Sequence, residues 1–277
     1  MTRRFRAVCE YDGSGFAGWQ IQPNALTVQG CIEHALASVL REPVRVSASG
    51  RTDAGVHALG QVISFVTERD IPPDGIRKGA NGFLPEGVRL TSVEPVSMEF
   101  DPRRNAVLRW YRYLVLNRPE APSWCRGILA HFPYPLDDVL IQKTTAFFRG
   151  EHDFNGFRSA DCEAERTVLT METCEAWRRG ALIIFDLRCR SFLMNMVRII
   201  IGGILDVARG RLHPDVLSEA LDTGCRNNMI PTAPARGLTL VRVYYPGDAV
   251  EPPPDGALDL WQTDARSGNL QDRRVQG

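Results

Sequence analysis

Hydrophobic and polar residues follow two different periods in the first third of the chain. Alternation of apolar with polar residues is the period of a half-buried strand. It predicts strands at residues 5–11, 44–48, 61–65 and 88–96. Apolar residues at helical spacing predict a helix over 28–40, capped by Thr27, and a shorter helix that follows the turn at 71–75 and ends near residue 82.

The chain up to residue 246 repeats this mixture. Alternation predicts further strands, at residues 106–117, 167–177, 181–190 and 237–245. The second and third of them should form a hairpin that turns at 179–180. Helical spacing predicts helices at 137–149, 192–209 and 213–223, with a loop at 150–158.

Two rounds of strands and helices, one on each side of residue 105, predict an α+β protein. Its antiparallel sheets should carry their helices on one face. We expect an N-terminal α+β half at residues 1–105 and a C-terminal α+β half at 106–246. Residues 247–277 lack core-forming periodicity, and we expect them to be mostly disordered.

Composition restricts the possible partners only slightly. The 277 residues are 44% hydrophobic, which is enough for a sizeable core, and 33 basic residues balance 33 acidic ones. Residues 247–277 hold six acidic and three basic residues, so the first 246 residues carry 30 basic and 27 acidic groups. A binding site for a polyanion must therefore be a local patch.

The cysteines and the longest apolar segment predict a soluble, cytoplasmic protein. Seven cysteines are scattered without a Cys-x-x-Cys pair, which argues against a disulfide framework and against a zinc site. Reduced thiols are typical of the cytosol. The apolar segment 192–207 is interrupted by Arg198 and Asp206 and is too short to cross a bilayer, and no hydrophobic region of signal-peptide length follows the N-terminus.

Residues 13–18 contain Gly-x-Gly-x-x-Gly, a pattern found in dinucleotide-binding sites. In such sites the glycines open a helix whose N-terminus holds the pyrophosphate. Here the next helix is expected only after Thr27, so no helix dipole would face these glycines. The sequence therefore argues against a nicotinamide cofactor.

The loop at residues 49–58 is the strongest candidate for chemistry. Gly50 and Gly55 enclose a cation, a hydroxyl and a carboxylate, and composition alone predicts an ordinary polar turn. The nine residues Gly-Arg-Thr-Asp-Ala-Gly-Val-His-Ala at 50–58, however, resemble the active-site signature of the TruA family of tRNA pseudouridine synthases. The resemblance implies that Asp53 is the catalytic carboxylate, acting as a nucleophile.

Arg198 is a second candidate. It interrupts a predicted helix that is apolar around most of its circumference, where a cation must either find a partner or reach water along its own stem. The string Phe-Leu-x-x-Met-Val-Arg at 192–198 resembles the C-terminal motif of the same family, whose arginine pairs with the catalytic aspartate. The resemblance implies an ion pair that keeps Asp53 charged and oriented. Asn195, Ile199 and Arg236 depart from the family pattern.

The resemblance gives roles to two further residues. Tyr111 matches the tyrosine that stacks on the target uracil, although an aromatic residue in a strand is more often part of the core. Arg51 matches a basic residue that takes the space left when the uridine is extruded from its helix. We interpret His57 as structural within its loop, and His152 and Asp153 as scaffolding.

Motifs of this family are spread over residues 5–246, and they imply a pseudouridine synthase fold with an RNA-binding cleft between its halves. They also imply a homodimer that converts uridine to pseudouridine on the 3′ side of the tRNA anticodon stem-loop (nucleotides 38–40). This isomerisation needs no metal and no cofactor. Whether Asp53 engages C1′ or C6, and whether Tyr111 or Asp53 removes the C5 proton, stay open.

Two other functions compete with this one. The first is an RNA-binding protein that keeps the fold without catalysis, against which the retention of Arg51, Asp53, Tyr111 and Arg198 argues. The second is a nucleoside hydrolase that uses Asp53 on a free nucleoside.

Overall fold

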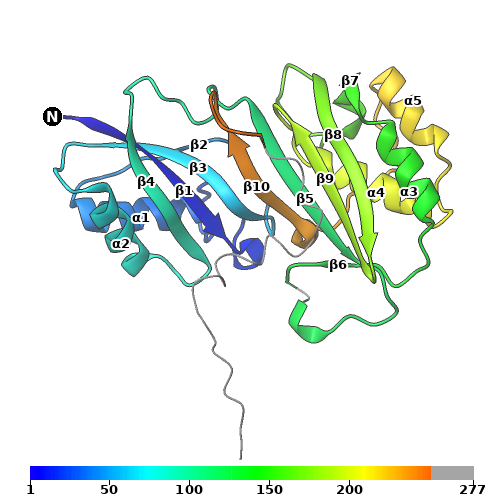
Figure 1. The fold of residues 1–277 in the computed structure, drawn as a ribbon, viewed down its shortest axis with the longest axis horizontal. Helices are drawn as coiled ribbons and strands as arrows, with labels where there is room; N and C mark the ends of the chain where they lie inside the picture. Colours follow the sequence, from blue (N-terminus) through cyan, green and yellow to red (C-terminus); the bar gives the residue numbers. More distant parts are fainter. Residues whose placement is uncertain (126, 251–277) are drawn as a thin grey trace, which may run out of the picture.

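A computed structural model describes residues 1–125 and 127–250 (Figure 1). Most of the tail predicted to be disordered, residues 251–277, therefore lies outside the described residues. The N-terminal part forms four strands and two α-helices around a short 3-10 helix, in the order β1 (Arg3–Tyr11), η1 (Gly13–Gly15), α1 (Val28–Leu40), β2 (Ser47–Ala48), β3 (His57–Thr67), α2 (Pro73–Phe83) and β4 (Val88–Val96).

The C-terminal part adds six strands and three α-helices. Its elements are β5 (Leu108–Leu116), η2 (Ser123–Cys125), β6 (Ala130–His131), α3 (Asp138–Ala146), β7 (Gly150–Asp153), η3 (Phe154–Phe157), β8 (Val168–Arg179), β9 (Leu182–Cys189), α4 (Met196–Ala208), α5 (Asp215–Thr223), η4 (Ala235–Gly237) and β10 (Leu238–Tyr244). The α+β class predicted from the sequence is confirmed.

All the described strands belong to one sheet, ordered β4-β1-β3-β10-β5-β9-β8-β7, with β2 on β3 and β6 on β5. The last strand, β10, lies between the two parts and joins them (Figure 1). It pairs antiparallel with β5 and parallel, over two residue pairs only, with β3. A single sheet therefore spans the molecule, and the boundary near residue 105 stays a prediction.

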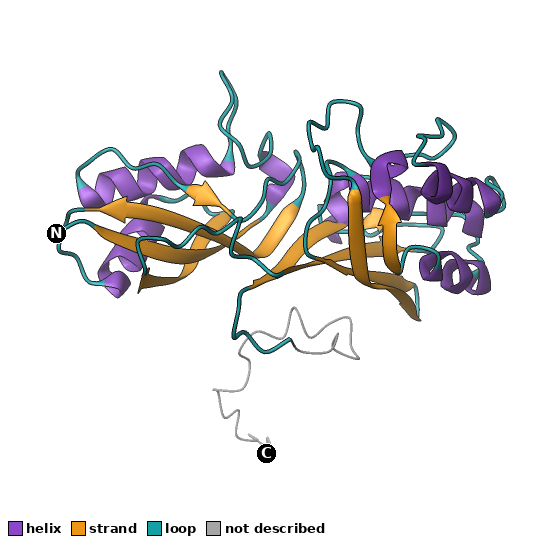
Figure 2. Ribbon diagram, turned by 90° about the horizontal axis from the view of Figure 1, so that it is seen from above, coloured by secondary structure: helices purple, strands orange, loops and turns teal. Residues whose placement is uncertain are grey.

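The helices cover one face of this sheet (Figure 2). Their buried residues belong to one large cluster that also holds Tyr111, Tyr113 and Val115 of β5. Residues Leu108, Trp110 and Leu114, which alternate with these along β5, lie in two small clusters without any helix residue. The two-residue period of the strand thus separates a helix-covered face from a helix-free face.

Three local predictions were wrong. The strand predicted at 44–48 is reduced to Ser47–Ala48, and the loop predicted at 150–158 contains the strand β7 and the short helix η3. The helix predicted from residue 192 begins only at Met196, because Asn195 has a φ of +60° and cannot continue a right-handed helix. The Thr27 cap is confirmed, since its side chain accepts a hydrogen bond from the Gly30 N–H.

A buried ion pair lies on the helix-free face. The Arg112 guanidinium donates from Nε and Nη2 to the two Asp186 carboxylate oxygens, both at 2.8 Å, across the β5–β9 pairing. Both side chains are buried, with 1% and 0% exposure. Trp110 and Trp177 flank the guanidinium, whose central carbon lies 5.2 and 5.5 Å from the two ring centroids. Each charge is therefore compensated almost entirely by the other.

Replacing Asp186 with alanine should lower the free energy of unfolding by about 3–5 kcal/mol, because it leaves the Arg112 guanidinium buried and unpaired. Urea unfolding measures this loss. Glu94→Ala is the matched control, since its pair with Arg6 lies at the surface and is worth about 0–1 kcal/mol. Equal losses in the two variants would contradict the importance of burial.

Candidate active site

A cavity of about 770 Å³ lies between the N-terminal and C-terminal parts. From the N-terminal part it is lined by the loop that contains Arg51, Thr52 and Asp53. From the C-terminal part it is lined by β5, through Tyr111, and by the segment 191–197 that leads into α4. The structure thus brings Tyr111 to the same cavity as Arg51 and Asp53, although Tyr111 belongs to a distant part of the sequence.

The loop with Asp53 packs against two of the three glycines of the Gly-x-Gly-x-x-Gly motif, Gly13 and Gly18. A Cβ atom on Gly13 would lie 2.0 Å from the Val56 carbonyl oxygen, and one on Gly18 would lie 2.9 Å from the Thr52 carbonyl oxygen. Gly18 also has a φ of +97°, which disfavours any side chain. These glycines therefore permit close packing against the candidate catalytic loop, which gives them a role without a dinucleotide.

Thr52 fixes the loop to the N-terminal part. Its carbonyl oxygen accepts a hydrogen bond from the Trp19 N–H at 3.0 Å, and its hydroxyl lies 2.8 Å from the Tyr11 hydroxyl. Thr52 and Tyr11 are both buried. The residue immediately before Asp53 is therefore held through both its backbone and its side chain.

Arg198 meets Asp53 across 145 positions of sequence. Its Nη1 donates to the Asp53 carboxylate at 3.2 Å and to the Asn195 side-chain oxygen at 2.6 Å, while its Nε donates to the Ala233 carbonyl oxygen at 2.9 Å. The Arg198 and Asp53 side chains are 18% and 32% exposed. The guanidinium is thus oriented by two neutral acceptors, and part of the carboxylate stays accessible from the cavity.

Asn195 is one of the residues that depart from the family pattern. Its left-handed backbone turns the chain from the cavity-lining segment into α4. Its side-chain oxygen accepts from Arg198, and its amide nitrogen donates to the Ser159 hydroxyl at 2.5 Å. Asparagine tolerates this backbone conformation better than most residues. The departure from the pattern therefore keeps an acceptor beside Arg198.

Residues 232–238, where Arg236 departs from the family pattern, pack beside α4. The Ala233 N–H donates to the Arg198 carbonyl oxygen at 2.9 Å, in addition to the bond that Ala233 accepts from Nε. The Tyr113 hydroxyl donates to the Pro234 carbonyl oxygen at 2.8 Å. The segment therefore connects Arg198 with strand β5.

Tyr111 is 8% exposed and meets the Phe192 ring edge-on, with the ring centroids 5.0 Å apart. Burial raises the pKa of its hydroxyl to about 12; Arg109 opposes this rise and Asp53 adds to it. No hydrogen bond joins this hydroxyl to another of the described residues. At neutral pH Tyr111 therefore presents a protonated hydroxyl that has no hydrogen-bond partner in the described part of the chain.

His57 closes the loop on its far side. His57 Nδ1 lies 3.1 Å from the Gly13 nitrogen and 3.1 Å from an Asp12 carboxylate oxygen, and His57 Nε2 lies 3.2 Å from the Arg236 carbonyl oxygen. Burial raises the pKa of the neighbouring Asp12, but hydrogen bonds from Ser14 and the nearby His57 outweigh it, so that this pKa is lowered. His57 joins the loop to residues far along the chain.

His152 and Asp153 do not line the Asp53 cavity. Asp153 accepts from the Asn155 N–H at the start of η3, and His152 contacts the Arg149 carbonyl oxygen. Among the described residues, no group of three His, Cys, Asp or Glu side chains is placed to hold a metal ion. None of the helices that the structure describes has the length and apolar character needed to cross a membrane.

The charges around the cavity are mixed. Arg51 and Arg103 are exposed and Arg109 is buried, and the lining also includes Asp161 and Glu163. Sequence reasoning gave Arg109 no role. The only available signal was that a charged residue interrupts a strand that is otherwise rich in core-forming side chains.

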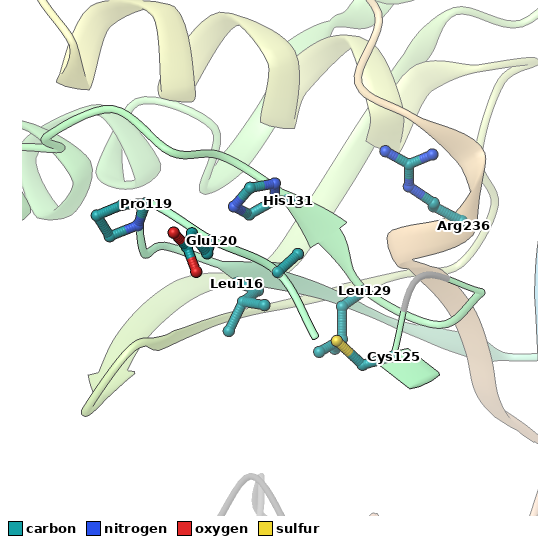
Figure 3. A pocket seen from close by; sticks show the side chains of 8 residues that line it. Leu116, Pro119, Glu120, Cys125, Leu129, His131 and Arg236 are labelled. Atoms are coloured by element: carbon teal, nitrogen blue, oxygen red, sulfur yellow. The ribbon is translucent and has the colours of Figure 1, made fainter. Parts of the chain in front are cut away.

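A second cavity, of about 580 Å³, lies elsewhere on the C-terminal part (Figure 3). It is lined by residues between Leu116 and His131, and by Arg236. None of the residues proposed to react or to hold uridine lines it. Its one link to the loop is Arg236, whose carbonyl oxygen accepts the hydrogen bond from His57.

A carboxylate paired with an arginine, beside an aromatic ring in a cavity between two parts of one mixed sheet, is the arrangement expected of a pseudouridine synthase. A model of the tRNA pseudouridine synthase family matches residues 7–103 and 145–246. This chain belongs to that family. It is therefore an isomerase that acts on uridine in tRNA.

Individual relatives match along almost their whole length. The protein named tRNA pseudouridine synthase A of Pelobacter propionicus is 41% identical over 243 residues, which cover 88% of this chain and 100% of that protein. The protein of the same name from Methylobacterium sp. strain 4-46 is 42% identical over 244 residues, covering 88% and 98%. A solved structure of a Cbf5-Nop10-Gar1 complex aligns with a TM-score of 0.34 at 11% identity, over 85% of this chain and 57% of that chain, a likeness too weak to bear on the fold.

Replacing Asn195 with glycine should lower kcat about tenfold with little change in stability. Glycine keeps the left-handed backbone, but the Arg198 guanidinium loses an acceptor, and one hydrogen bond to a charged group is worth about 1.5 kcal/mol. Steady-state kinetics on tRNA measure the effect. Ser159→Ala is the control, because it removes only the contact on the amide side; an equal effect in both variants would contradict a role through Arg198.

Proposed function

We propose that this enzyme isomerises uridine on the 3′ side of the tRNA anticodon stem-loop, with Asp53 as the reacting carboxylate. The observation that carries the proposal is the contact between Asp53 and Arg198 in a cavity that Tyr111 also lines. The family supplies the substrate class, and the relatives named tRNA pseudouridine synthase A support the particular activity.

The reaction breaks the N1–C1′ bond, turns the uracil and joins C5 to C1′. Substrate and product contain the same atoms, so no co-substrate is consumed. An anion is needed beside C1′ or C6, and the Asp53 carboxylate is partly exposed to the cavity while Arg198 holds it. If the carboxylate attacks C1′, the N1–C1′ bond breaks and uracil leaves as an anion. C5 of the turned uracil then displaces the carboxylate from C1′. Finally the C5 proton is lost and N1 gains a proton.

Tyr111 is proposed to stack on the uracil and to help remove the C5 proton. Because its pKa is raised to about 12, the side chain enters the reaction as a hydroxyl. A hydroxyl takes up a proton only as it passes its own to another acceptor, and we propose Asp53, which lines the same cavity, as that acceptor. Tyr111 and Asp53 would then remove the C5 proton together.

Arg51 is proposed to fill the space that the uridine leaves. Its side chain is exposed where the cavity meets solvent, two residues before Asp53. A base inside a stacked helix must be extruded before it reacts, at a cost of a few kcal/mol. An arginine that stacks and pairs with phosphate suits this place.

We also infer that the enzyme works as a homodimer in the cytoplasm. The dimer follows from the family resemblance, and light scattering should then give twice the 30.9 kDa of the chain. The cytoplasm is supported by the cysteines, all seven of which are free. Neither RNA binding without catalysis nor nucleoside hydrolysis is favoured by any feature of the cavity.

Tritium release from tRNA labelled at C5 of uridine tests the function, since C5 loses its proton only if isomerisation occurs. The wild-type enzyme should release the label, and Asp53→Asn, which keeps the shape and removes the charge, should release none. Pseudouridine should map to the 3′ side of the anticodon stem-loop. Binding without release would favour the RNA-binding alternative, and free uracil would favour a hydrolase.

Tyr111→Phe is the companion variant in the same assay. It keeps the ring for stacking and removes only the hydroxyl, so KM should stay near the wild-type value while kcat falls by about 100-fold, the size of a typical proton-transfer contribution. A kcat equal to that of the wild type would assign the C5 proton to Asp53 alone.

A further inference from the structure

Arg109 is a buried arginine without a carboxylate partner. It is 8% exposed and lies on β5, two residues before Tyr111 and on the same face of the strand. Among the described residues, no acidic side chain forms an ion pair with it. Arg112, on the opposite face of the same strand, is instead neutralised by Asp186. Since a buried charge is costly unless it is compensated, the contacts of Arg109 require an explanation.

These contacts are carbonyl oxygens from three separate segments. Nε and Nη2 donate to the Ser49 carbonyl oxygen at 3.3 and 2.6 Å, Nη2 also donates to the Arg103 carbonyl oxygen at 3.1 Å, and Nη1 donates to the Arg190 carbonyl oxygen. Ser49 begins the loop that carries Asp53, Arg103 lies between β4 and β5, and Arg190 follows β9. One side chain thus joins all three segments.

Arg109 has little capacity left for RNA. A guanidinium has five N–H donors, and the four hydrogen bonds to these carbonyl oxygens leave one of them. A phosphate-binding arginine in the same cavity would present its fork to solvent, as the exposed Arg51 and Arg103 do. Arg109 is therefore built to hold protein backbone rather than substrate.

The anchored residue is fixed to the N-terminal part as well. The Ser49 hydroxyl donates to Gln61 Oε1 at 2.5 Å, the Ser49 N–H donates to the Val62 carbonyl oxygen at 2.8 Å, and Gln61 Nε2 donates to the Gly50 carbonyl oxygen at 2.8 Å. Because β3 holds Ser49 from one side, Arg109 determines where β5 lies relative to the start of the loop.

We propose that Arg109 is a positioning residue that ties the start of the Asp53 loop to the strand carrying Tyr111, and so sets the separation of Asp53 from the uracil-stacking ring. The inference rests on the proposed roles of Asp53 and Tyr111. Arg198 holds the same loop at Asp53 and His57 holds it at its end, so the loop has three attachments to the C-terminal part. Arg109 supplies the attachment nearest to Tyr111 along the chain.

The test compares Arg109→Gln and Arg109→Lys with Arg104→Ala in steady-state pseudouridine formation on tRNA. Arg109→Gln should lower kcat about 100-fold, because a misplacement of about 1 Å in the reacting groups has that effect. KM for tRNA should stay near the wild-type value, since the exposed arginines remain. The kcat of Arg109→Lys should lie between those of the wild type and Arg109→Gln. An ammonium group keeps the charge but cannot reach the three carbonyl oxygens at once.

Arg104→Ala should behave as the wild type, because its side chain is 87% exposed and outside the cavity. Each variant is assayed well below its own melting temperature, so that a smaller folded fraction does not pass for a slower reaction. If Arg109→Gln does not fold, the lysine variant decides.

Two results would overturn the proposal. A wild-type kcat in Arg109→Lys would show that the charge alone suffices, and a raised KM with unchanged kcat would make Arg109 an RNA contact. A wild-type enzyme that forms no pseudouridine would instead refute the proposed function, so the two failures are distinguishable.

Discussion

The geometry of the site depends on one contact, between the Asp53 carboxylate and the Arg198 guanidinium, which joins residues 145 positions apart. Neither group is fully buried, so water still screens the pair in the free protein. The relative position of the two charged groups is set by hydrogen bonds with uncharged groups around them. Thr52 is fixed by Trp19 and Tyr11 on one side, and Arg198 is fixed by Asn195 and Ala233 on the other. If RNA covers the cavity and excludes water, as the proposed function requires, the same pair would become stronger without having to move.

The sheet makes this contact possible. Strand β10, the last in the sequence, lies between β3 and β5, and it connects the strand that follows the Asp53 loop to the strand that carries Tyr111. The segment just before β10 supplies the carbonyl oxygens that accept from Arg198 and His57. Residues near the end of the described chain thus hold a loop near its beginning. The short parallel pairing of β10 with β3 is reinforced by these side-chain contacts, which lie at the same end of the strand.

Periodicity in the sequence predicted most elements, because strands such as β1 and helices such as α1 bury one face. It failed at two places. The left-handed backbone of Asn195 makes α4 begin four residues later than the apolar composition suggests. In the run 44–48, only Ser47–Ala48 pairs with the sheet. The short motifs predicted four site residues. Asp53, Tyr111 and Arg51 line one cavity. Arg198 does not line it but contacts Asp53. Arg109 escaped prediction, because its contacts are backbone carbonyls from three distant segments, and a carbonyl carries no sequence signal.

Three arginines show how one side chain serves three purposes in this fold. Arg112 points to the helix-free face and is neutralised by Asp186, so it contributes no charge to the cavity. Arg109, on the other face, is bound by carbonyl oxygens that compensate its burial but leave its charge in place. Arg198 shares its charge with a carboxylate that also faces the cavity. Strand alternation alone decides between the first two, because positions 109 and 112 fall on opposite faces. The cavity lining as a whole carries as many arginines as carboxylates, so a polyanionic substrate would meet positive charge there only at individual side chains.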